Sequence, residues 1–172
     1  MPKEVFKVAV LAQSRPPVTQ WGGRVVRPMA VFAHVPGTAP GTKVSDEDGV
    51  ETWYLGACDV TLHSGDTEYY RSNLTSGRPS VWVALPEASE GARAKVQLVT
   101  VDPYEGEGLA SDVGLVVEAV AMPDAVRTRL ETFIAAHHVD IPFKKRKRKP
   151  VDVVSDPRAP RILSPQDKWE KR

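Results

Sequence analysis

MPDAVRTRLETFIAAHHVDIPFKKRKRK, residues 122–149, is the stretch that decides the fold of this chain. Pro123 suits the first position of a helix, where its missing N–H costs nothing, and Asp124 then lies in the first turn, where its charge complements the helix dipole. Apolar side chains recur at the i, i+4, i+7, i+8 spacing of a single helix face, at Val126, Leu130, Phe133 and Ile134. We therefore predict one amphipathic C-terminal helix.

Two histidines close the predicted helix. At about 100° per residue, His137 falls in the middle of the apolar stripe and His138 diverges from it by about 100°. We expect His137 to be a hydrogen-bonded residue that completes the stripe, and His138 to face solvent or cap the helix near its C-terminus. Ile141-Pro142 ends the helix, and Phe143 offers one more apolar anchor.

The residues before this helix predict a β-rich body. Alternating or compact apolar runs favour strands at residues 5–12, 21–34, 51–63, 79–85, 95–101 and 113–121. In the second stretch, Gly22-Gly23 and Pro28 indicate a bulge or an edge position. In the third stretch, strict alternation places four side chains on one face, those of Tyr54, Cys58, Val60 and Leu62.

Three segments between the strands have their own signals. Residues 34–48 are predicted to be a loop by composition. Residues 66–74 favour a short helix capped by Asp66, with a strand as the alternative. Asp102-Pro103-Tyr104-Glu105 is interpreted as a turn in preference to a catalytic carboxylate pair.

These elements predict an α+β fold. No βαβ alternation is present, so a parallel sheet is not expected. We predict an antiparallel sheet or half-barrel of about six strands, closed by the one C-terminal amphipathic helix and followed by a disordered basic tail. Residues 1–143 would form a single α+β domain, and residues 144–172 the basic run and the tail.

Charge divides the chain at the same boundary. Residues 144–172 hold 11 of the 23 lysines and arginines and 4 of the 22 acidic residues, so this part carries +7 and residues 1–143 carry −6. An acidic body argues against a nucleic-acid surface spread over the whole domain. The tail is too rich in Pro, Asp, Arg and Ser to bury a core, and we expect it to be disordered unless bound.

The cysteine count and the hydropathy indicate the cellular compartment that we expect. Cys58 is the only cysteine, which excludes an internal disulfide and a cysteine-rich zinc site. The start of the chain lacks the layout of a signal peptide, because Lys7 interrupts a short apolar run. No segment approaches the roughly 20 apolar residues of a membrane helix. We therefore expect a soluble, cytoplasmic protein without a membrane contact.

The sequence predicts no catalytic, metal or cofactor site. Cys58 and His63 are five residues apart on one predicted strand, hence on opposite faces, and His137 and His138 diverge, so neither pair is arranged to share a metal ion. Cys58 is interpreted as a small core residue. No GxSxG elbow is present, and Pro16-Pro17 removes the N–H donors that a phosphate-cradling loop after the first strand requires.

Six consecutive cations are the strongest single feature. We interpret them either as a solvated run or as a contact for RNA, DNA or an acidic protein surface. Three large apolar residues of the tail are predicted to dock in a partner's groove, a neutral disordered end being the alternative. The predicted partner-binding residues are Lys144, Lys145, Arg146, Lys147, Arg148, Lys149, Ile162, Leu163 and Trp169.

Segments spread over residues 6–149 resemble an uncharacterised bacterial domain-of-unknown-function family. The resemblance rests on WYLG at 53–56, Leu62-His63, Asp66, Glu68, Tyr70, Asn73-Leu74, VWVAL at 81–85, Pro103-Tyr104-Glu105, Val117-Glu118, Met122-Pro123 and HHVDIPFKKRKRK at 137–149. Genes of the family are typically found beside molybdenum-dependent formate dehydrogenases and their maturation factors. Some members are labelled molybdopterin-guanine dinucleotide biosynthesis protein A.

The resemblance implies a role with a molybdoenzyme and supplies no catalytic residues. Enzymes with that biosynthetic label are doubly wound nucleotidyltransferases that open with a glycine-rich GTP loop, and residues 13–24 depart from that pattern. The favoured hypothesis is a non-catalytic accessory, maturation or subunit-like protein that binds a formate dehydrogenase or its maturation factors. The alternatives are nucleic-acid binding through residues 144–149 and nucleotidyl transfer to molybdopterin. A polar pocket is the remaining candidate for chemistry, formed by His63, Asp66, Glu105, His137 and His138.

Overall fold

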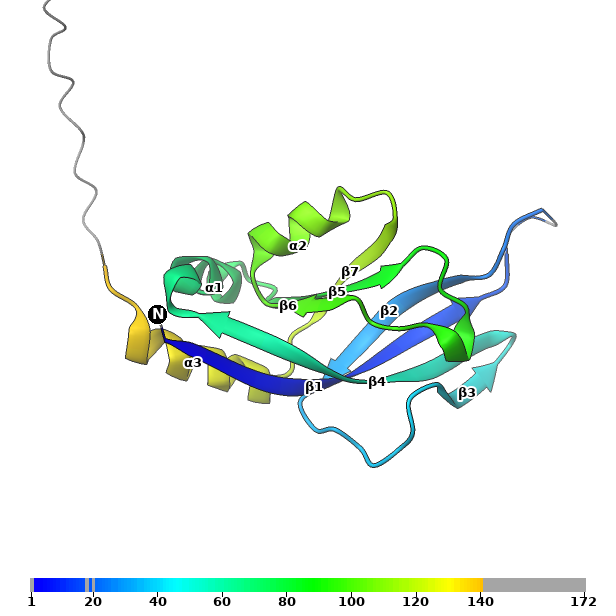
Figure 1. Ribbon diagram of the computed structural model, residues 1–172, viewed down its shortest axis with the longest axis horizontal. Coiled ribbons are helices and arrows are strands. Elements are labelled where there is room, and N and C mark those ends of the chain that lie inside the picture. Colours follow the sequence, from blue (N-terminus) through cyan, green and yellow to red (C-terminus); the bar gives the residue numbers. More distant parts are fainter. Residues whose placement is uncertain (1, 18, 20, 141–172) are drawn as a thin grey trace, which may run out of the picture. The chain divides into compact units, whose positions relative to one another are not determined.

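Two antiparallel β-sheets form the body of the molecule (Figure 1). The computed structural model describes residues 2–17, 19 and 21–140. One sheet has the strand order β2-β1-β4-β3 and the other has the order β6-β5-β7. The elements are β1 (Lys3–Arg15), β2 (Val25–Phe32), β3 (Thr42–Glu47), β4 (Val50–His63), η1 (Ser64–Asp66), α1 (Thr67–Thr75), β5 (Ser80–Pro86), η2 (Gly91–Arg93), β6 (Leu98–Thr100), α2 (Pro103–Ala110), β7 (Leu115–Ala121) and α3 (Asp124–His137).

The chain divides into two units, Met1–Val139 and Asp140–Arg172. Nearly all of the described residues belong to the first unit. The predicted basic run and tail, residues 144–172, lie outside the described residues.

The pairing of β1 with β4 forms the centre of the four-stranded sheet. It extends from Lys3 opposite His63 to Ser14 opposite Glu51. Along β1, the side chains of Phe6, Val8, Val10 and Ala12 alternate on the face that meets the core and are all buried, and Ala9 on the opposite face is buried as well. This alternation confirms the predicted first strand and fixes which face of the sheet meets the core.

A bulge bends the outer strand β2. Leu11 pairs with Ala30 and Ala12 pairs with Pro28, so Met29 is the extra residue. β2 is an edge strand of its sheet, where the N–H that Pro28 lacks is not needed for a second neighbour. Both alternatives predicted for this stretch, a bulge and an edge position, are confirmed.

A second bulge changes which residues of β4 share a face. Val10 pairs with Gly56 and Leu11 pairs with Tyr54, so Leu55 is the extra residue. One extra residue moves every side chain before it to the opposite face. The expectation that Tyr54 shares a face with Cys58, Val60 and Leu62 is therefore wrong, because it assumed unbroken alternation.

Strand β3 replaces part of the predicted loop. Residues 42–47 pair with the beginning of β4 in a hairpin that places Glu47 opposite Val50. The turn residues Asp48 and Gly49 both have positive φ, 52° and 78°, as a two-residue hairpin turn demands. The expectation of a loop through residue 48 is wrong here, because Asp-Gly between two short extended runs is a hairpin signal.

Helix α2 packs on the three-stranded sheet, and Figure 1 shows it over β5 and β7. Asp102 caps α2, because its carboxylate accepts hydrogen bonds from the N–H groups of Tyr104 (2.8 Å) and Glu105 (3.4 Å). Pro103 occupies the first turn, which tolerates proline. The prediction of a mere turn at residues 102–105 is wrong: Asp-Pro begins a helix here.

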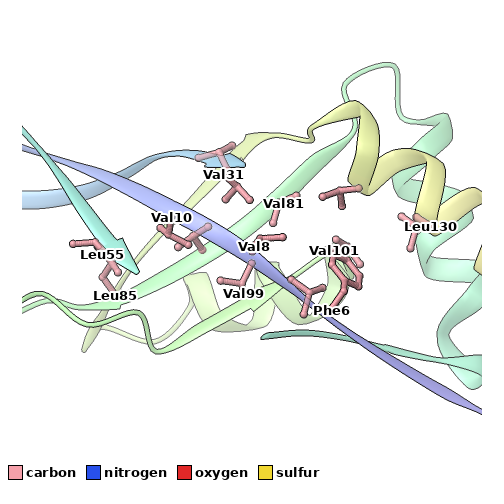
Figure 2. Close-up of a cluster of buried hydrophobic side chains, with 14 of the residues drawn as sticks. Phe6, Val8, Val10, Val31, Leu55, Val81, Leu85, Val99, Val101 and Leu130 are labelled. Carbon is pink, nitrogen blue, oxygen red and sulfur yellow. The ribbon is translucent and has the colours of Figure 1, made fainter. Parts of the chain in front are cut away.

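The core lies between the two sheets and extends to the helices at one end. Figure 2 shows Val8 and Val10 of β1 beside Val81 of β5, with Leu130 of α3 at the end of the cluster. Val126, Leu130 and Phe133 are all buried, so the predicted apolar stripe of the C-terminal helix faces the body. At about 25 cal/mol per Å² of apolar surface, this burial is the main favourable term in folding.

The coarse prediction of an α+β fold with antiparallel strands is confirmed. The single six-stranded sheet or half-barrel closed by one helix is not, since the described residues form seven strands in two sheets and three α-helices. The chain leaves the first sheet at His63, and α1 carries it to the second. Within the described residues, no helix combines the length and the apolar character needed to cross a membrane.

Candidate functional site

A polar hollow gathers three of the five residues predicted to form a pocket. His63 ends β4, Asp66 ends η1, and Glu105 lies in the first turn of α2, and all three line one cavity of about 430 Å³. His63 and Glu105 are exposed to solvent, and Asp66 is half-buried. The hollow is lined by Lys3, Asp59, Thr61, His63, Asp66, Tyr70, Leu98, Val99, Thr100, Asp102 and Glu105.

Tyr70 is the fixed part of this hollow. Its side chain is 2% exposed, and its hydroxyl oxygen accepts a hydrogen bond from the backbone N–H of His63 at 3.0 Å. Burial raises the pKa of Tyr70 to about 12. The phenol therefore stays protonated at neutral pH and joins α1 to the end of β4.

Carboxylates set the electrostatics of the hollow. Burial raises the pKa of Asp102 above its ordinary value of 3.8, and the nearby carboxylates of Asp66 and Glu105 act in the same direction. Asp59 is already paired, since its carboxylate lies 2.9 Å from Lys7 Nζ. The surplus of negative charge suits a cationic group better than an anionic one.

Several groups of the polar hollow have structural partners. Within the described ranges, no group of three or more His, Cys, Asp and Glu side chains is arranged to hold a metal ion. Asp102 has a structural task as a helix cap, and Tyr70 has one as a tie between elements.

The two helix histidines lie elsewhere. The ring of His137 contacts Phe133 edge-on, with centroids 4.6 Å apart. His138 is the C-cap of α3, and its side chain is only 16% exposed. Its Nδ1 lies 3.1 Å from Thr67 Oγ1, and its Nε2 lies 3.3 Å from Arg71 Nη1. His138 therefore takes the predicted capping position but docks α3 onto α1 instead of facing solvent, and neither histidine lines the polar hollow.

An apolar hollow on the outer face of the four-stranded sheet was missed from the sequence. Ala9, Leu11 and Tyr54 form its floor, and Phe32 and Val44 form its rim; these five residues are the outer apolar hollow. The floor side chains of Ala9 and Tyr54 are 2% and 3% exposed, whereas Phe32 and Val44 are 49% and 57% exposed. The hollow measures about 350 Å³ and continues under the loop that carries His34, Pro36 and Thr38.

The sequence does contain a signal for this hollow. The run from Val8 to Ala12, VAVLA, is apolar at every position, whereas a strand with one solvated face alternates. An all-apolar central strand indicates that both faces are shielded from water. The second bulge then turns Tyr54 toward Leu11, its partner in β1, which alternation alone did not predict.

The chain matches one protein family over most of its length. The family is described as "Protein of unknown function (DUF3305)", and the match spans residues 7–147. The chain belongs to the DUF3305 family. No curated protein and no solved structure matches it.

In this DUF3305 domain, the match covers both candidate surfaces. Every residue of the outer apolar hollow falls within residues 7–147, and so does every residue of the polar hollow except Lys3. The match agrees with the resemblance to an uncharacterised domain family. The predicted partner-binding residues Ile162, Leu163 and Trp169 lie beyond it, and they also lie outside the described residues, as does the basic run.

Cys58 of the DUF3305 domain packs against the core, as the sequence predicts. Its side chain is half-buried beside the core cluster. Burial raises the pKa of its thiol, and the neighbouring Asp59 carboxylate adds to this effect. The thiol is therefore protonated at neutral pH, the opposite of what a catalytic nucleophile needs.

Proposed function

We propose that this protein is a non-catalytic accessory protein that binds a protein partner through the outer apolar hollow. The observation that carries the proposal is the pair of exposed apolar rim residues, Phe32 and Val44, over a buried apolar floor. Apolar pockets of this kind take the large anchor side chains that dominate protein–protein binding energy.

The partner that we propose is a molybdenum-dependent oxidoreductase of the formate dehydrogenase type, or one of its maturation factors, in the cytoplasm. Support for this class of partner comes from the sequence resemblance, because genes of such a family are typically found beside those enzymes.

A pull-down with a matched pair of variants tests this proposal. Tagged full-length protein at native expression is expected to recover the dehydrogenase or a maturation factor, identified by mass spectrometry. Phe32→Asp removes a rim residue and should weaken the affinity by about thirtyfold, the effect of losing roughly 2 kcal/mol at a binding hot spot, and so reduce recovery. Val113→Asp makes the same change at a position that is 91% exposed and far from the rim in sequence, and should leave recovery unchanged.

Two results would overturn the proposal. One is recovery of neither a dehydrogenase nor a maturation factor by the unaltered protein. The other is equal recovery by the Phe32 and Val113 variants, which would show that the partner does not use the outer apolar hollow.

Nucleic-acid binding through the six cations at residues 144–149 is the second candidate. The density of charge in this run favours it, since each phosphate that a protein neutralises releases a counterion. The expected signature is a slope of about one log unit of affinity per log unit of salt for each neutralised phosphate. Filter binding at low salt measures this slope, and no retention there would remove the candidate.

Nucleotidyl transfer to molybdopterin is the third candidate, and the fold does not favour it. The described residues form two antiparallel sheets, whereas the enzymes of that name have a doubly wound parallel fold. Incubation of the protein with GTP, magnesium and molybdopterin is expected to yield no dinucleotide. Formation of the dinucleotide would make this candidate the correct one.

A further inference from the structure

A further hollow of the described molecule lies away from both candidate surfaces. It lies where the end of β1 and the beginning of β2 meet β7, and it measures about 730 Å³. This size falls within the range of sites for small organic molecules. Its wall includes the apolar side chains of Val25 and Met29, which are 43% and 39% exposed.

Three arginines from three separate segments line this hollow. Arg15 comes from the end of β1, Arg27 from β2, and Arg78 from the turn before β5. Among the described residues, the lining contains a single carboxylate, that of Glu118 in β7, whose Oε1 lies 2.7 Å from Arg27 Nη1. The hollow is therefore cationic, although residues 1–143 carry −6.

Two of the three arginines have no carboxylate partner within the part of the chain that the structure describes. There, neither Arg15 nor Arg78 forms an ion pair, whereas several other cations of the body do, at Lys7, Arg24, Lys43, Arg127 and Arg129. Arg15 donates one hydrogen bond, to Gln13 Oε1 at 3.3 Å. An arginine carries several N–H donors in a planar fork that fits phosphate and carboxylate groups, so both side chains retain donors for an anion.

We propose that this hollow binds a small anionic molecule, in which a phosphate or carboxylate group contacts Arg15 and Arg78 and an apolar part lies against Val25 and Met29. The Arg27–Glu118 pair links β2 to β7 across the same hollow and holds the third guanidinium in place. Binding is expected to weaken as salt rises, because all of these charges are accessible to solvent.

Calorimetry of the full chain with two probes tests the proposal and separates its two chemical sources. Inorganic pyrophosphate reports a phosphate site, and citrate reports a carboxylate site. The double variant Arg15→Gln, Arg78→Gln is expected to bind the preferred probe at least about tenfold more weakly, since each lost charge-assisted hydrogen bond is worth about a factor of ten or more. Glu118→Gln removes the one carboxylate and should tighten binding by about twofold.

The control removes equal charge elsewhere. Arg93 and Lys95 are both exposed and lie outside the hollow, and Arg93→Gln, Lys95→Gln should leave the affinity unchanged. A background in which residues 144–149 are glutamines keeps the basic run from binding the probes. The proposal is overturned if neither probe binds at about 10 mM, well above the 1 mM constant of even a weak complex. It is also overturned if the Arg15/Arg78 variant binds as well as the control variant.

Discussion

Asn73 shows how a single polar side chain joins three elements of this fold. It is 2% exposed, and its Nδ2 donates hydrogen bonds to the carbonyl oxygens of Ser80 and Val101, both at 2.8 Å. Its Oδ1 accepts a hydrogen bond from the N–H of Ser80 at 3.0 Å. One amide thus satisfies backbone groups at the start of β5 and just after β6 from a position in α1.

Replacement of Asn73 by leucine should be strongly destabilising. Asn73→Leu keeps a side chain that branches at the same carbon, although leucine is larger, and leaves three buried backbone groups without partners, at about 1–3 kcal/mol each. We expect a loss of about 3–5 kcal/mol in the free energy of unfolding, measured by urea denaturation. Ser72→Ala, one position earlier on the exposed side of α1, should change this free energy by less than about 0.5 kcal/mol. A loss below about 1 kcal/mol for Asn73→Leu would contradict this role.

Asp102 makes a prediction about pH. Burial raises its pKa above 3.8 in the folded protein, and an acid with a raised folded pKa stabilises the fold at low pH and loses that contribution as the pH rises through the folded pKa. An asparagine at this position would still cap α2, since asparagine and aspartate cap equally well. The stability of Asp102→Asn relative to the unaltered protein should therefore increase as the pH rises from below 3.8 through the raised pKa of Asp102, and then level off. Urea denaturation across this range measures the difference, and a relative decrease would contradict the sign.

At the scale of elements, α2 can approach the second sheet because it has a glycine at the contact. An ideal Cβ on Gly106 would lie 2.2 Å from Cγ of the Trp82 ring, whereas Gly108 has no described atom within 4 Å of its Cβ position. Gly106→Ala should destabilise the protein by about 1–3 kcal/mol through overpacking, despite the better helix propensity of alanine.

The second glycine of α2 is the matched control for this prediction. Gly108→Ala adds the same methyl group on an open side of the helix and should stabilise the protein by up to about 1 kcal/mol. Thermal unfolding of the two variants distinguishes them by the sign of the change. Equal shifts in the same direction would mean that Trp82 does not set the approach of α2.

The elements that the sequence predicts well are those whose pattern is local. The stripe at Val126, Leu130 and Phe133 and the alternation in β1 are repeated within one element, so each can be interpreted without knowledge of its neighbours. The errors occur where pairing with a neighbouring strand determines the local structure. The extra residue at Leu55 exists only in register with β1, and the hairpin of β3 depends on two residues, Asp48 and Gly49, inside a stretch of loop-like composition.

The candidate site follows the same division. Three residues of the polar hollow lie at the ends of elements: His63 ends β4, Asp66 ends η1 and Glu105 lies in the first turn of α2. Polar residues at the ends of elements are predicted to be accessible from the sequence pattern alone. The outer apolar hollow is formed by residues of four neighbouring strands, β1, β2, β3 and β4. These residues meet only when the strands pair in the correct register. Sequence order alone does not carry that register.

At the scale of the whole molecule, the buried core of the described residues lies within the first unit. Its buried cluster begins at Phe6 and ends at Phe133. Removal of residues 150–172 should therefore leave the melting temperature unchanged within about 1–2 °C, since about 1 kcal/mol corresponds to a few degrees for a domain of this size. The same truncation should weaken partner binding if Ile162, Leu163 and Trp169 are anchors, as the sequence predicts.

Two measurements on one truncated protein separate these expectations. Calorimetric melting reports the fold, and the pull-down reports the partner. A lower melting temperature would show that the tail contributes to the body, and equal recovery of the partner by both lengths would show that the tail contributes nothing to binding.

The two edge strands of the four-stranded sheet, β2 and β3, affect the direction from which a partner can approach. β2 carries Pro28, which offers no N–H for a further strand, and β3 carries Lys43, Asp46 and Glu47, features that discourage strand addition. Extension of this sheet by backbone pairing, as in PDZ-type ligands, is therefore disfavoured at both borders. We expect the partner that we propose to meet the sheet face-on through its side chains, so that an isolated extended peptide is a poorer ligand than a folded surface with one protruding apolar residue.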